Sequence, residues 1–199
     1  MATIDFDEIE HWEPLFERFV LEIAPSNLLG DLVRLQAEFV EEARTFVIEQ
    51  VGRTSLGEHL DARLADHRVR VFHATRVTEA ARDSIQATGL QPLCLAARRP
   101  ELEQILSDHA RWEAVKSRLD DVLAEIGPGE RAGRREDDRI HVCFSKAGLM
   151  RGCSHYLTHG AEVDGHIANL LFGDRSAERL LSAARRPYLV PFSRPYPEV

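Results

Sequence analysis

Segments with alternating hydrophobicity lie far apart in this sequence, and their separation limits the folds available to the chain. Residues 69–73 and 140–145 alternate apolar and polar side chains in the manner of half-buried strands, and a third candidate strand covers residues 188–192. Helical patterns fill the long intervals between them. This layout predicts an α+β fold with a small split sheet and inserted helices, since regular βαβ repeats place their strands closer together.

The first 68 residues carry a helical pattern and no strand signal. Residues 28–51 have apolar side chains at steps of three and four, with Pro25-Ser26-Asn27 before them and Gly52 after them, which predicts one long helix. Shorter helices are expected at residues 6–23 and 55–65. We therefore predict a helical N-terminal subdomain, residues 1–68, followed by an α+β domain, residues 69–199.

The α+β domain contains several further helix signals. Thr78 and Gly89 are a typical start and stop for a helix over residues 79–88. Pro100 suits the first turn of a long helix or helix pair that reaches residue 126. Residues 130–139 are almost entirely charged or glycine and predict a surface loop, and helices are expected at 163–172 and 177–185.

The charge is unevenly distributed between these two parts. The net charge is −8, but residues 1–68 hold fifteen Asp and Glu against six Arg, whereas residues 69–199 hold eighteen against nineteen basic residues. The acidic helices are either a solvated surface or a docking surface for a basic protein partner. Extensive nucleic-acid binding is not expected of so acidic a chain, because it requires many basic side chains facing phosphates.

The composition also bears on compartment. No apolar run approaches the roughly 20 residues of a membrane-spanning helix, and the N-terminus is acidic at once, unlike a secretory signal. Three cysteines without a Cys-x-x-Cys pair do not suggest a disulfide scaffold. We expect a cytoplasmic protein without a membrane partner.

Two separated stretches have a spelling typical of one enzyme family. The first is Val71-Phe72-His73-Ala74-Thr75-Arg76, followed by Ala81, Ile85 and then Gly89-Leu90; the second is His141 to Ser145, followed by residues 154–162, Ser-His-Tyr-Leu-Thr-His-Gly-Ala-Glu. Together they resemble ADP-ribosyltransferases of the His-Tyr-Glu class, in which a strand ending in His-Gly-Thr precedes a helix and a Gly-Leu pair. The resemblance covers about residues 69–199.

The resemblance implies an enzyme that uses NAD as a substrate and cleaves its nicotinamide–ribose bond, with no metal ion required. His73 would bind a ribose hydroxyl, Tyr156 would stack on the nicotinamide ring, and Glu162 would stabilise the positive charge that develops on the ribose. A fixed carboxylate is most effective where such charge develops away from water. The expected cofactor-binding residues are His73, Ala74, Thr75, Arg76, Ser145 and Tyr156.

Two positions depart from the family's pattern. Ala74 stands where the family has glycine, which adds a methyl group where the ligand approaches. The family also places its catalytic glutamate on a later strand, whereas Glu162 lies in a Gly-Ala-Glu turn soon after Tyr156. Glu198 is the alternative, although it lies next to the C-terminus, so both remain candidates, with Glu162 preferred.

Other interpretations of the same residues remain open. His73 could be a hydrogen-bonded core histidine, and Tyr156 a half-buried aromatic with a solvated hydroxyl. His155, His159, Glu162 and His166 recur at helical spacing, a pattern that could bind a divalent metal and activate water for hydrolysis. A third class is a non-catalytic interaction protein that works through its acidic helices.

Overall fold

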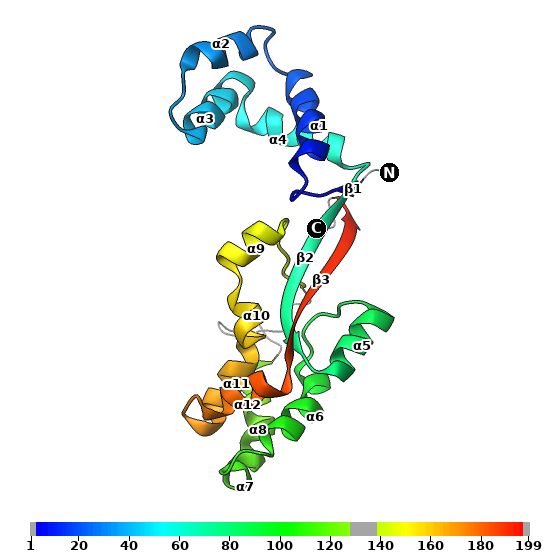
Figure 1. Ribbon diagram of the computed structural model, residues 1–199, viewed down its shortest axis with the longest axis vertical. Helices are drawn as coiled ribbons and strands as arrows, with labels where there is room; N and C mark the ends of the chain where they lie inside the picture. The colour runs from blue at the N-terminus through cyan, green and yellow to red at the C-terminus, as the bar shows by residue number, and fades with distance from the viewer. Residues whose placement is uncertain (1–2, 128–138, 197–199) are drawn as a thin grey trace. The chain divides into compact units, whose positions relative to one another are not determined.

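The computed structural model describes residues 3–127 and 139–196, and it divides the chain into two compact units (Figure 1). The first unit comprises Met1–Val71 and Phe192–Val199, and the second comprises Phe72–Pro191. The described residues form helices and one small sheet, so the fold class is α+β, as predicted. Within the described ranges, no helix combines the length and the apolar character that crossing a bilayer requires.

The sheet has three strands in the order β1-β2-β3, where β1 is Thr3–Ile4, β2 is Arg68–Val77 and β3 is Arg186–Pro195. Strand β1 is parallel to β2, with Thr3 opposite Arg68 and Ile4 opposite Val69. The strands predicted at 69–73 and 188–192 are confirmed and are longer than expected. Strand β1 was not predicted, because two residues carry no detectable alternation.

The strand predicted at residues 140–145 was wrong. The segment makes one isolated antiparallel bridge, in which the backbone N–H of Phe72 donates to the carbonyl of Cys143 at 2.8 Å and the N–H of Cys143 donates back at 2.9 Å. Phe144 is exposed. Alternating hydrophobicity is satisfied by any half-buried extended chain, and it does not report whether a second strand supplies the remaining hydrogen bonds.

The described residues of the first unit form the helices α1 (Ile9–Leu21), α2 (Leu28–Leu35), α3 (Val40–Val51) and α4 (Arg53–Leu64). The single helix predicted over 28–51 was therefore wrong. Gln36 has a left-handed conformation, with φ of 47° and ψ of 44°, and ends α2. A right-handed helix cannot continue through such a residue, and the local sequence gave no sign of it because glutamine seldom adopts this conformation.

The core of the first unit is small and aromatic. Ile4, Phe19 and Leu64 are buried together, and Trp12 and Phe16 pack against them with ring centroids 5.3 Å apart. Tyr196, at the end of the described chain, packs against this core, and its backbone N–H donates to the carbonyl of His67 at 3.1 Å. The Tyr196 hydroxyl donates to Asp61, and this hydrogen bond, together with burial, raises the pKa of Tyr196.

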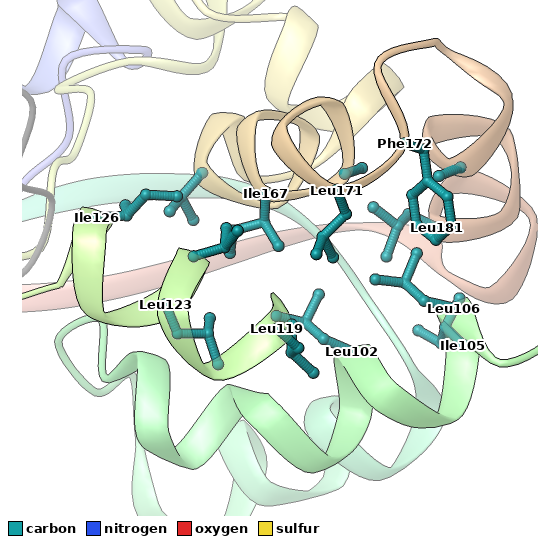
Figure 2. Packing of buried hydrophobic residues seen from close by; sticks show 14 of the residues in the cluster. Leu102, Ile105, Leu106, Leu119, Leu123, Ile126, Ile167, Leu171, Phe172 and Leu181 are labelled. Carbon is teal, nitrogen blue, oxygen red and sulfur yellow. The ribbon is translucent and has the colours of Figure 1, made fainter. Parts of the chain in front are cut away.

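The second unit contains the larger core. Its longer helices are α5 (Glu79–Thr88), α6 (Leu95–Leu106), α8 (Leu119–Ile126), α11 (Glu162–Phe172) and α12 (Ser176–Ala184). Between them lie the short helices α7 (Trp112–Val115), α9 (Lys146–Gly152) and α10 (His155–His159), and a 3-10 turn at Lys116–Arg118. Figure 2 shows leucine, isoleucine and phenylalanine side chains of α6, α8, α11 and α12 converging. Each such side chain contributes about 1.5–3 kcal/mol when fully buried.

The helix signals of this unit were partly confirmed. Helix α5 has the predicted bounds, with the Thr78 hydroxyl accepting from the N–H of Ala81. Helix α6 begins at Leu95, so the prediction that Pro100 lies in a first turn was wrong. The pattern over 100–126 resolves into several helices, and α9 and α10 were not predicted. Most of the predicted loop at 130–139, and Glu198, lie outside the described residues.

Candidate functional site

A polar cavity of about 480 Å³ lies in the second unit, among helices α10, α11 and α12. Its size falls within the usual range for small-molecule sites, roughly 300–1,000 Å³. We call it the α10–α11 cavity. Its polar lining comes from three imidazoles, two carboxylates, a guanidinium and an amide: His155, His159, His166, Glu162, Glu178, Arg175 and Asn169.

The cavity depends on a sharp break between α10 and α11. Gly160 ends α10 with φ of +84°, a conformation that other residues rarely adopt. A Cβ atom at this position would lie 3.3 Å from the Cβ of Arg76, so a side chain here would also be tightly placed against β2. The helical spacing of His155, His159 and Glu162 therefore spans two helices, and all three still line one cavity.

Two of the three predicted catalytic residues are linked through His155. The imidazole of His155 lies against the ring of Tyr156, with centroids 4.2 Å apart and planes inclined at 37°. The same imidazole contacts the Glu162 carboxylate, with Nε2 3.2 Å from Oε1. Tyr156 packs against the buried cluster formed by Phe72, Ala74 and Leu149. The imidazole of His155 therefore contacts both the Tyr156 ring and the Glu162 carboxylate.

His73 lies in a different setting. Its Nδ1 is 2.9 Å from the carbonyl oxygen of His141. A carbonyl can only accept, so Nδ1 donates this hydrogen bond and Nε2 is the ring nitrogen that it leaves uncommitted. Successive strand residues point to opposite faces, so His73 does not share the face of Phe72 and Ala74, against which Tyr156 packs. His73 is accordingly not a member of the Tyr156–His155–Glu162 contacts.

The remaining predicted binding residues have visible structural contacts. The Arg76 guanidinium donates to the carbonyls of Leu157 at 3.0 Å, Ser182 at 2.8 Å and Arg185 at 2.9 Å, which fastens α10 and α12 to β2. The Ser145 hydroxyl accepts from the N–H of Gly148 at 2.9 Å and caps α9. Ala74 is buried, and Thr75 is half-buried on β2.

A buried charge network adjoins the cavity helices and was not identified from the sequence. Asp164 on α11 accepts from Arg98 through Nε at 3.1 Å, and from Arg185 through Nη1 at 2.5 Å. Arg185 also donates to Glu101 at 2.9 Å. Burial disfavours the Arg98 cation, yet the charge of Asp164 and its hydrogen bond hold the pKa of Arg98 above its ordinary value. The available signal was a carboxylate at a position that the apolar pattern of α11 assigns to the core.

The Cys143 thiol of the second unit is not an activated nucleophile. Cys143 and Cys153 pack in the same cluster as Tyr156. Burial raises the pKa of Cys143, and a hydrogen bond with the Cys153 thiol raises it further. A thiol with a raised pKa is a poor nucleophile near neutral pH, because the thiolate is the reactive form.

The metal-site interpretation receives no geometric support. Within residues 3–127 and 139–196, no three His, Cys, Asp or Glu side chains are grouped so that they could hold a metal ion. His155, His159, Glu162 and His166 line the cavity from two helices rather than from one continuous helix face. The contact between His155 and Glu162 is instead a pairwise one.

The geometry leaves one cavity in which residues predicted from the sequence meet. It offers the Glu162 carboxylate and the adjacent His155 imidazole, and the Tyr156 ring lies against that imidazole without lining the cavity itself. Asp164 and Arg185 form a buried ion pair that involves the same helix, α11. Protein-family models, curated proteins and solved structures were all compared with this chain, and none of them matches it.

Proposed function

We propose that the chain is an ADP-ribosyltransferase-like enzyme that cleaves the nicotinamide–ribose bond of NAD, and either transfers ADP-ribose to a macromolecule or hydrolyses NAD. The observation that carries the proposal is the contact of His155, which lines the α10–α11 cavity, with both Glu162, which also lines it, and Tyr156, which lies behind His155. An aromatic face favours a cationic pyridinium ring. A carboxylate favours the positive charge that remains on the ribose when nicotinamide leaves.

The neighbouring groups suit this division of roles. The imidazole of His155 contacts one Glu162 oxygen and so restricts the orientation of the carboxylate. Glu162 also lies in the first turn of α11, near the partial positive charge of the helix N-terminus. An ionised carboxylate of fixed orientation is the form that stabilises an oxocarbenium-like transition state without reorganising during the reaction.

His73 has a supporting role in this proposal. With Nδ1–H committed to the carbonyl of His141, Nε2 is the nitrogen that would accept from a ribose hydroxyl. His73 and Ala74 point to opposite faces of β2, and Tyr156 packs against the cluster that contains Ala74. In this proposal NAD therefore lies across the edge of β2, with the ribose at His73 and the nicotinamide at Tyr156.

The proposal predicts release of nicotinamide from NAD by the wild-type protein and its loss in His73→Ala. Nicotinamide is separated chromatographically after incubation with NAD, and circular dichroism confirms that the variant is folded. The matched control is His109→Ala, which removes an imidazole that contacts Ser176 and Phe172 instead. Undiminished release by His73→Ala would remove His73 from the site, and no release by the wild type would contradict the proposed activity.

A further inference from the structure

The helix pair α2–α3 of the first unit presents an unusual number of large apolar side chains to solvent. The exposed fraction is 79% for Val33, 80% for Val40 and 59% for Phe39. Leu29 and Leu35 are exposed as well. We call these five residues the α2–α3 apolar surface. Single exposed apolar residues are ordinary, whereas apolar side chains gathered on one part of a surface are typical of contact surfaces.

These side chains are not needed for the packing of the helices on each other. Helix α2 packs on α3, and α3 packs on α4. The inward face of α2 is supplied by Leu28, which is buried, and by Leu32 four residues later. Leu29 and Val33 are also four residues apart and form a second stripe beside the first. Helix α3 buries none of its residues fully, and Val40 at its start is exposed and available to a partner.

Acidic side chains surround this surface in the sequence. Glu38, Glu41 and Glu42 are exposed and flank Phe39 and Val40 on both sides. Glu42 accepts from the backbone N–H of Glu38 at 3.0 Å, so the carboxylate is held at the start of α3. On α2, Arg34 pairs with Asp31 at 2.7 Å. A complementary partner carries Lys or Arg beside apolar side chains.

The acidic charge beside this surface disfavours two other binding partners, a second copy of the chain and an anionic membrane. In a symmetric dimer the same surface meets itself, and the glutamates of two copies would repel each other. An anionic membrane surface attracts basic segments and would repel this one. The amphipathic basic helix of a different protein satisfies both the apolar and the acidic features.

We propose that the α2–α3 apolar surface binds an amphipathic helix of another protein, with Leu- or Ile-like side chains along one face and Lys or Arg at its borders. The inference rests on the first unit alone. It stands whether or not the second unit cleaves NAD.

The test uses the full chain and a synthetic helical peptide of Leu and Lys, about four turns long, in a heptad pattern, with binding followed by fluorescence anisotropy at about 0.15 M salt. The variant is Val33→Asp/Val40→Asp. It adds negative charge, so simple electrostatic attraction to the peptide would increase. We expect a loss of at least about tenfold in affinity, the usual effect of removing central apolar contacts.

Two controls locate the effect. Ile9→Asp removes another exposed apolar residue of the first unit, at the start of α1, and should bind the peptide as the wild type does. Glu38→Lys/Glu41→Lys should weaken binding, whereas Glu13→Lys/Glu17→Lys on α1 should have a smaller effect. Equal binding by Val33→Asp/Val40→Asp and the wild type would overturn the proposal. Self-association of the wild type in sedimentation, or its binding to anionic vesicles, abolished by the same variant, would overturn it too.

Discussion

Replacing Asp164 by alanine should lower the free energy of unfolding of the second unit by about 3–5 kcal/mol, the usual cost of removing one partner of a buried ion pair. Asp164 and Arg185 are each about 1% exposed. Without the carboxylate, Arg185 keeps only Glu101, and Arg98 loses the partner that its pKa depends on. The expected result follows from leaving cations uncompensated in the core. It does not require the intact network to be stabilising in itself.

Denaturant unfolding followed by circular dichroism measures the effect. Asp174→Ala is the matched control, because Asp174 is an exposed carboxylate on the same unit that pairs with Arg111 and accepts from the N–H of Ser176. Its replacement should cause a much smaller change. If Asp164→Ala and Asp174→Ala unfold at similar denaturant concentrations, the buried network is not a determinant of stability.

Replacing Glu162 by glutamine should reduce the rate of NAD cleavage by about 10²–10³-fold, the scale observed when one group that stabilises transition-state charge is removed. Glutamine retains the size of the side chain but not its negative charge. Binding of NAD should change little, since the ground state has no oxocarbenium charge for the carboxylate to stabilise. The effect should therefore appear in kcat rather than in KM.

The rate of nicotinamide release over a range of NAD concentrations separates these two parameters. Glu178→Gln is the control, because Glu178 lines the same cavity from α12 but has no part in the contacts of His155. It should retain most of the activity. Equal losses in Glu162→Gln and Glu178→Gln would indicate a general change in the charge of the cavity and would remove Glu162 from its proposed role.

The parts of the fold that were predictable from sequence are those set by local signals. Helix α5 is an example, since the Thr78 cap and the Gly89 stop act within a few residues of each other. The break at Gln36 was not predictable, because its left-handed conformation follows from how α2 and α3 pack. Likewise, the single bridge of Cys143 to Phe72 is decided by which chain segments lie beside β2.

The candidate site shows the same division. The spacing of His155, His159 and Glu162 correctly placed these side chains near one another, although two helices rather than one present them. The network of Asp164 and Arg185 could not be derived in this way. Glu101 is 84 positions from Arg185 in the sequence, and only the packing of α6 on α12 brings them together.

Calorimetric titration of the wild-type protein with NAD tests the central claim most directly, because it asks whether a dinucleotide occupies the second unit before any chemistry is considered. The account predicts saturable binding at one site per chain, reduced by excess nicotinamide and weakened in Tyr156→Ala. Absence of heat at millimolar NAD, or binding that is unchanged in Tyr156→Ala, would contradict it.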